Sequence, residues 1–145
     1  MPPADKELRR RVEERAARHC EYCRSPLRYS PASFSLDHVI PLARGGTTEP
    51  SNLALACQGC NSRKHAKVTA RDPVSGATVP LFNPRHDRWR EHFSWSPDTT
   101  TVIGLSPSGR ATVEALRLNR EGLVAQRRLL FEAGEHPPAE PGSGE

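Results

Sequence analysis

The chain has 145 residues, of which 35% are hydrophobic and 6% aromatic, and its formal net charge is +4. This length favours one domain with at most an appendage, and so lean a core would gain from a structural metal. No stretch approaches the roughly 18 apolar residues of a membrane span, and the charged N-terminus lacks the apolar segment of a secretory signal. We therefore expect no membrane partner and a cytoplasmic location.

The positive charge is concentrated in the first part of the chain. Residues 1–67 contain 12 Lys and Arg against 7 Asp and Glu, whereas residues 68–145 contain 9 against 10. A basic segment suits a polyanionic partner such as a nucleic acid. All four cysteines, and Asp37 and His38, lie in this basic part of the chain.

The first part of the chain predicts helices, a strand and loops. Asp5 is a suitable N-cap, and apolar residues recur every four positions from Leu8, which is typical of a helix. Phe34, Leu36 and His38 alternate with their neighbours and would share one face of a strand. The elements expected here are helices at 5–18 and 61–67, a strand at 33–40, and a short turn or helix at 51–56.

The second part follows a turn-rich connector at 71–77. Asn119 is a plausible cap for a helix, and Trp89 and Trp95 are interpreted as core residues rather than as platforms for bases. Leucines recur at helical spacing and are expected to face inward: Leu116, Leu123, Leu129 and Leu130. The elements expected are strands at 78–82 and 99–105 and helices at 112–118 and 119–133.

These elements predict a single α+β unit with four segments. The segments are an N-terminal helix (1–18), a core (19–70), a C-terminal α/β extension packed on that core (71–133), and a disordered tail (134–145).

Two CxxC pairs contain every cysteine of the chain: Cys20 and Cys23, then Cys57 and Cys60. Inside a cell such pairs favour metal binding over disulfides, and four thiolates match the tetrahedral preference of Zn²⁺. A site with four cysteine ligands has no open position, so the zinc would be structural. The alternative is a redox pair or four unrelated buried cysteines.

Polar residues between and beyond the cysteines form a second pattern. The sequence DHxxPxxxGG occupies 37–46, NL occupies 52–53, and CxxCNxxK occupies 57–64. In this order and spacing the set resembles the HNH endonucleases, also called ββα-metal or His-Me finger nucleases. The run at 81–93 and GRATV at 109–113 resemble the extension of one bacterial subgroup of these proteins.

The resemblance implies a ββα-metal core and a role for each motif residue. His38 would be the general base that activates water, as a histidine can accept a proton at neutral pH. Asp37 and Asn61 would bind a catalytic divalent ion, and their oxygen atoms suit Mg²⁺ or Mn²⁺. Asn52 would hold the loop and orient His38. In a regular strand Asp37 and His38 point to opposite faces, so a bend would be needed to bring both to one site.

The implied activity is hydrolysis of DNA phosphodiester bonds, leaving 5′-phosphate and 3′-hydroxyl ends. RNA remains open as a substrate. Basic residues near the motif are candidates for phosphate contacts: Arg44, Arg63, Lys64 and Lys67. The remaining histidines have no motif support and are interpreted as ordinary surface or core residues: His19, His65, His86, His92 and His136.

Two other functions compete with a nuclease. One is a zinc-stabilised nucleic-acid-binding module that has lost cleavage, and the other is a structural zinc protein that acts through protein contacts. The intact set of Asp37, His38, Asn52 and Asn61 favours the enzyme, because a degenerate nuclease would usually lose some of these. The oligomeric state is not evident from the sequence.

Overall fold

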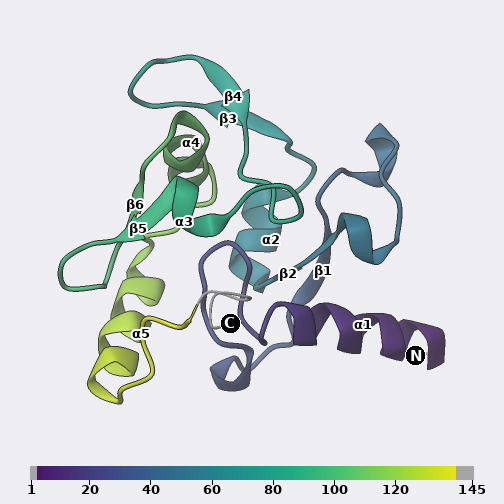
Figure 1. Cartoon of the computed structure of the whole chain (residues 1–145), viewed down its shortest axis with the longest axis horizontal. Coiled ribbons are helices and arrows are strands. Elements are labelled where there is room, and N and C mark those ends of the chain that lie inside the picture. Colours follow the sequence, from purple (N-terminus) through teal and green to yellow (C-terminus); the bar gives the residue numbers. More distant parts are fainter. Residues whose placement is uncertain (1–2, 140–145) are drawn as a thin grey trace.

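The computed structural model describes residues 3–139, and Figure 1 shows their arrangement. Short helices alternate with three two-stranded antiparallel sheets in this part of the chain, which confirms the predicted α+β class. The helices are α1 (Pro3–Arg15), α2 (Gln58–Lys64), α3 (Trp89–His92), α4 (Pro107–Ala115) and α5 (Glu121–Glu132). The strands are β1 (Ser35–His38), β2 (Leu53–Ala56), β3 (Thr69–Arg71), β4 (Thr78–Pro80), β5 (Phe93–Trp95) and β6 (Val102–Gly104).

The elements β1, β2 and α2 follow one another as two antiparallel strands and a helix, the order that the resemblance implies. Ser35 pairs with Ala56 and His38 with Leu53, so the two strands are in register along their whole length. Helix α2 then contacts both strands. In Figure 1 this unit lies beside α1, which also contacts β2.

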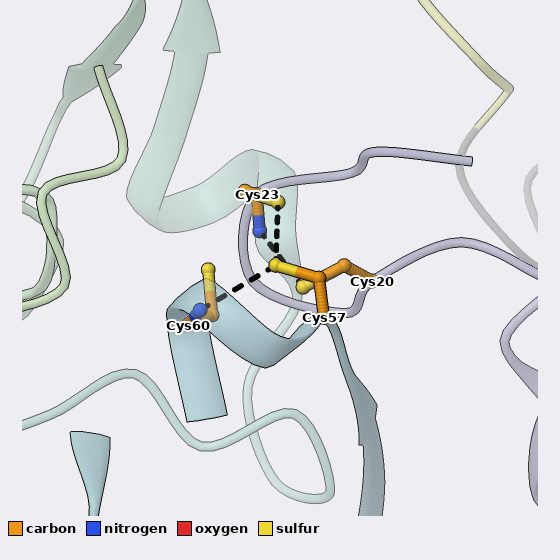
Figure 2. Close-up of side chains that lie close together, drawn as sticks. All are labelled: Cys20, Cys23, Cys57 and Cys60. Carbon is orange, nitrogen blue, oxygen red and sulfur yellow. Dashed lines mark hydrogen bonds between the residues drawn. The ribbon is translucent and has the colours of Figure 1, made fainter. Parts of the chain in front are cut away.

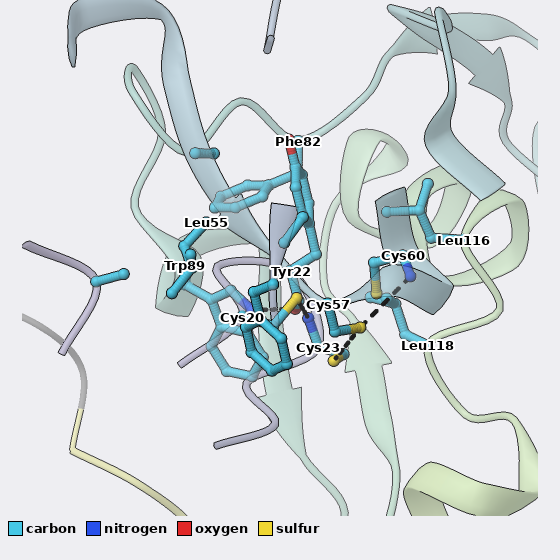
Figure 3. Packing of buried hydrophobic residues seen from close by; sticks show 14 of the residues in the cluster. Cys20, Tyr22, Cys23, Leu55, Cys57, Cys60, Phe82, Trp89, Leu116 and Leu118 are labelled. Atoms are coloured by element: carbon cyan, nitrogen blue, oxygen red, sulfur yellow. Dashed lines mark hydrogen bonds between the residues drawn. The ribbon is translucent and has the colours of Figure 1, made fainter. Parts of the chain in front are cut away.

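One hydrophobic core joins the cysteine segments to the C-terminal elements (Figure 3). Tyr22, between the first two cysteines, packs edge-on against Phe82 with ring centroids 6.4 Å apart. Trp89 is buried and lies against Phe93 and Trp95, as expected for core aromatics. Burial of these rings stabilises the packing of the extension on the cysteine-bearing segment, because apolar area is removed from water on both sides.

Several elements differ from the sequence expectation. The segment 53–56 is a strand rather than a turn or helix. Its four residues are all buried, so buried and exposed side chains do not alternate along it. Strand β3 was not expected; it pairs with β4 across the predicted connector. Helix α4 begins five residues earlier than expected, because Ser106 caps it by accepting a bond from the Gly109 N–H and Pro107 occupies its first turn.

In and before helix α5, two predictions are wrong: the burial of Leu129 and the capping role of Asn119. Leu129 is 66% exposed rather than buried, whereas Leu116 and Leu123 are buried as expected. Asn119 does not cap the helix; Arg120 occupies that position. The Asn119 side chain instead accepts from the Val102 N–H and donates to the Val102 carbonyl, which holds β6.

The predicted boundaries at 18, 70 and 133 stay predictions. Of the predicted disordered tail, residues 134–139 are described, and His136 is buried against Trp95. Residues 140–145 lie outside the described residues. Among the helices that the structure describes, none has the length and apolar character needed to cross a bilayer.

Candidate active site and metal centre

The end of β1 brings Asp37 and His38 to one cleft of about 700 Å³. Asp37 is buried, whereas His38 is partly exposed. Both nevertheless line this cleft, although successive side chains of a regular strand point apart. Residues of α1 and α2 also line the cleft. Its polar lining includes Asp5, Arg9, Ser35, Thr48, Asn61, Ser62 and His65.

Two donors hold the Asp37 carboxylate. The Tyr22 hydroxyl donates to Asp37 Oδ2 at 2.7 Å, and Lys64 Nζ lies 3.2 Å from the same oxygen and 3.3 Å from Oδ1. Burial raises the pKa of Asp37, and Lys64 and Tyr22 offset part of that rise. Burial, followed by the charge of Asp37, raises the pKa of Tyr22, so this phenol remains a donor.

The Asp37 carboxylate keeps capacity for a further partner. An ionised carboxylate offers about four acceptor positions, and the contacts from Tyr22 and Lys64 account for three. Asn61 lines the same cleft, and its side-chain amide offers an oxygen atom as a metal ligand. Carboxylate and amide oxygens suit Mg²⁺ or Mn²⁺, so these residues fit the divalent ion that the resemblance implies.

The prediction that Lys64 contacts phosphate is wrong, because the residue is buried. Only 1% of the residue is exposed, and its ammonium also donates to the carbonyls of His38 and Val39 at 3.2 and 3.1 Å. Every contact of the ammonium is therefore with the end of β1, out of reach of a phosphate. Lys64 supports the Asp37 carboxylate and the strand end instead.

Removing the Lys64 ammonium should destabilise the fold. In Lys64→Met the buried carboxylate loses its ion-pair partner, which costs about 3–5 kcal/mol for a buried pair. We expect the free energy of unfolding, measured in urea, to fall by this order. Lys67→Met is the matched control, because Lys67 is exposed. A Lys64→Met protein within 1 kcal/mol of wild type would contradict this role.

Asn52 fastens the loop that follows β1. Its side-chain oxygen accepts from the Ile40 N–H, and its amide donates to the carbonyls of Ile40 and Thr47, each at 2.9 Å. Gly46 packs against these groups, and a Cβ atom on it would come within 1.7 Å of the Ile40 carbonyl oxygen. These three hydrogen bonds therefore require a short amide side chain at position 52 and a glycine at position 46. They hold the backbone of the loop that follows His38.

The His38 ring is held by one neighbour from this loop. His38 Nε2 lies 3.0 Å from Thr48 Oγ1. Because His38 is partly exposed and lines the cleft, its other ring nitrogen, Nδ1, is left to exchange a proton with solvent. Asn52 reaches the ring only through the loop that carries Thr48, so its effect on His38 is indirect.

The other three basic candidates remain available at the surface. Arg44 is exposed at the end of a short 3₁₀ turn, and Lys67 is exposed after α2. Arg63 is partly exposed, with Nη1 donating to the Gly59 carbonyl at 3.1 Å. Side chains of this kind can approach a phosphate backbone without reading sequence.

His65 is a cleft residue that the sequence interpretation missed. It is exposed, follows the end of α2 and lines the cleft together with Asp37, His38 and Asn61. The available signal was its spacing, four residues after Asn61, which places the two on one side of a helix. The imidazole of His65 offers a nitrogen atom as a metal ligand in the cleft. Imidazole nitrogen binds transition metals more strongly than it binds Mg²⁺.

The four cysteines meet within the hydrophobic core, with two of them from the segment after α1 and two from the start of α2 (Figure 2). Their sulfur atoms all lie within 4.8 Å of one another. Among residues 3–139, these four cysteines are the group of three or more His, Cys, Asp or Glu side chains that lie close enough together to hold a metal ion. In each pair the second cysteine N–H donates to the sulfur of the first at 3.4 Å. This geometry fits Zn²⁺.

The thiols cannot all ionise together without a cation. Burial raises the pKa of Cys20, whereas hydrogen bonds from the other three cysteines lower that of Cys57. All four are free cysteines. A metal dication would provide four thiolates with a common counter-charge, which removes this conflict.

Comparison with known proteins agrees with this geometry. A search of curated proteins and a search of solved structures gave no match. The family model described as HNH endonuclease matches residues 20–67, which include all four cysteines, Asp37, His38, Asn52 and Asn61. The resemblance predicted from the sequence is thus confirmed over residues 20–67, the segment that matches the HNH endonuclease model.

Proposed function

We propose that this protein is an endonuclease that hydrolyses phosphodiester bonds of DNA with the help of a divalent metal ion. The observation that carries the proposal is the common cleft of Asp37, His38 and Asn61 within the matched domain. It places a carboxylate, an imidazole and an amide around one open volume. Hydrolysis of a phosphodiester needs such groups, because water must be activated and charge on phosphorus neutralised.

His38 is the proposed general base. Thr48 limits rotation of the ring through its 3.0 Å contact with Nε2. The other ring nitrogen, Nδ1, is the one that would accept a proton from a water molecule in the cleft. Asn52 maintains this arrangement by holding the loop between Ile40 and Thr47. Protein groups therefore set the position of the base before substrate arrives.

Asp37 and Asn61 are the proposed metal-binding residues, with His65 as a third donor. The chemistry that a bound Mg²⁺ or Mn²⁺ supplies in such a site is stabilisation of the phosphorane and of the leaving 3′ oxygen. Tyr22 and Lys64 hold the Asp37 carboxylate in one position through their hydrogen bonds. Lys64 also favours the ionised form of that carboxylate, as required of a ligand.

DNA is the proposed substrate, held by charge rather than by reading of bases. Arg44, Arg63 and Lys67 belong to the segments that flank the cleft, and the first 67 residues have an excess of positive charge. Contacts of this type weaken as salt concentration rises, because bound counterions are released from the nucleic acid.

The test is a plasmid cleavage assay with the zinc-loaded protein and added Mg²⁺ or Mn²⁺. We expect supercoiled DNA to become nicked or linear only when the added ion is present. DNA that is bound in a salt-dependent way but never cut would instead support a binding module. Single-stranded RNA in a parallel reaction distinguishes a ribonuclease, since preferential cleavage of RNA would overturn the choice of DNA.

A further inference from the structure

Two arginines from the C-terminal extension reach the cysteine centre. Arg120, at the start of α5, places Nη2 at 3.3 Å from Cys57 Sγ and Nη1 at 3.6 Å from Cys60 Sγ. These contacts span 63 and 60 residues of sequence. They join the second cysteine pair to a part of the chain that lies outside the matched HNH segment.

The guanidinium of Arg120 is seated against the cysteine pair. A Cβ atom at Gly59 would lie 2.5 Å from Arg120 Nη2 and 2.9 Å from its Cζ, so only a glycine leaves room for it. Its Nη1 also donates to the carbonyls of Leu116 and Arg117 at 3.1 Å each. The side chain is therefore held from the end of α4 and directed at the two sulfur atoms.

Arg127 approaches the other cysteine pair. The residue is 3% exposed, and its Nη2 donates to the Cys23 carbonyl at 3.3 Å and to the Leu118 carbonyl at 2.8 Å. Its guanidinium also lies over the ring of Trp95, 5.1 Å from the centroid. A positive charge thus lies beside each cysteine pair: the partly exposed Arg120 at the sulfur atoms of Cys57 and Cys60, and the buried Arg127 at the Cys23 carbonyl.

The charges of this arrangement are complementary. A zinc dication with four thiolates has a net charge of −2, and a buried net charge is costly unless it is paired. Arg120 and Arg127 supply two positive charges that no ordinary pH removes. Hydrogen bonds to metal-bound ligands hold them in position and tune how strongly they bind the metal.

We propose that Arg120 is a positioning residue of the zinc centre, donating N–H···S hydrogen bonds to Cys57 and Cys60 and, with Arg127, neutralising the centre. The C-terminal extension thereby slows the loss of zinc. This inference depends on the cysteine site alone and is independent of whether the protein cuts DNA.

The first experiment measures how fast zinc passes from the full-length protein to a chromogenic chelator. Arg120→Ala removes the N–H···S contacts to both sulfur atoms and should accelerate zinc release by about tenfold or more, the usual effect of losing a partner of a metal ligand. Arg128→Ala is the control, since Arg128 is an exposed arginine of the same helix. It should release zinc at the wild-type rate.

A second variant separates this role from simple support of the fold. Gly59→Ala keeps Arg120 but displaces its guanidinium, because the new Cβ would occupy the same space. Alanine also favours a helix over glycine, so α2 itself gains stability. Faster zinc release from Gly59→Ala would therefore support the N–H···S contacts, even if Arg120→Ala fails to fold.

Cobalt substitution provides a spectroscopic readout of the same bonds. With Co²⁺ in the cysteine site, loss of N–H donors should shift the sulfur-to-metal charge-transfer band to lower energy in both variants. Release rates within twofold of wild type in both variants would overturn the proposal. An unshifted band in both, with only a lower melting temperature for Arg120→Ala, would also overturn it and leave a structural role.

Discussion

Replacing His38 by alanine should lower the rate of DNA cleavage by about 10²–10⁴-fold, the usual contribution of a general base. The variant should keep its fold, because the imidazole is partly exposed and its side-chain contact is with Thr48 at 3.0 Å. No buried partner is left unpaired by its removal. The measurement is the initial rate of nicking of a supercoiled plasmid at saturating Mg²⁺ or Mn²⁺.

Two controls make this result specific. His86→Ala changes an exposed histidine that does not line the cleft of Asp37 and His38, and it should cut at the wild-type rate. Circular dichroism and zinc content should match wild type in both variants. A His38→Ala protein that cuts within tenfold of the wild-type rate would show that another group activates the water.

Complete removal of zinc should unfold the protein. Structural zinc contributes about 10–16 kcal/mol in zinc-finger peptides, which equals or exceeds the entire stability of about 5–15 kcal/mol of an ordinary domain. The four cysteines belong to the same hydrophobic core as Trp89 and Phe93, so loss of the metal should extend beyond residues 20–67. We therefore expect loss of secondary structure and exposure of both tryptophans together.

The measurement is circular dichroism and tryptophan fluorescence during titration with a strong chelator. Chelator saturated with zinc beforehand is the control, and added Zn²⁺ should restore both signals. Trp89 is buried, packs on Trp95 and donates its indole N–H to the Tyr22 carbonyl, so the tryptophan emission reports on the packing of the extension against the cysteine-bearing segment. Unchanged spectra after all zinc has been removed would contradict a structural metal.

The sequence was most informative where chemistry depends on short spacing. Two cysteines separated by two residues can bind one metal ion, so the two CxxC pairs predicted a metal cluster, and the four sulfur atoms do converge. The neighbours Asp37 and His38 and the later Asn61 likewise predicted one site, and all three line the same cleft. Their assigned roles in catalysis stay predictions.

Secondary structure was less accurate where burial removes the periodic signal. Strand β2 is buried on both faces and has the sequence Leu-Ala-Leu-Ala, which alternates in size but not in polarity. Leu129 follows a helical spacing, yet α5 leaves that side uncovered. Periodicity identifies the faces of an element, but packing decides which face is covered.

Residues that act through distant partners could be assigned only from the tertiary structure. By itself the sequence determined the α+β class, the cysteine cluster and the HNH segment, because each depends on local order and spacing. The tertiary structure decided that Lys64 supports Asp37 instead of phosphate, that His65 lines the cleft, and that Arg120 reaches the cysteines. The physical reason is that a charged side chain takes its role from the groups it meets on burial, and those groups come from distant parts of the chain.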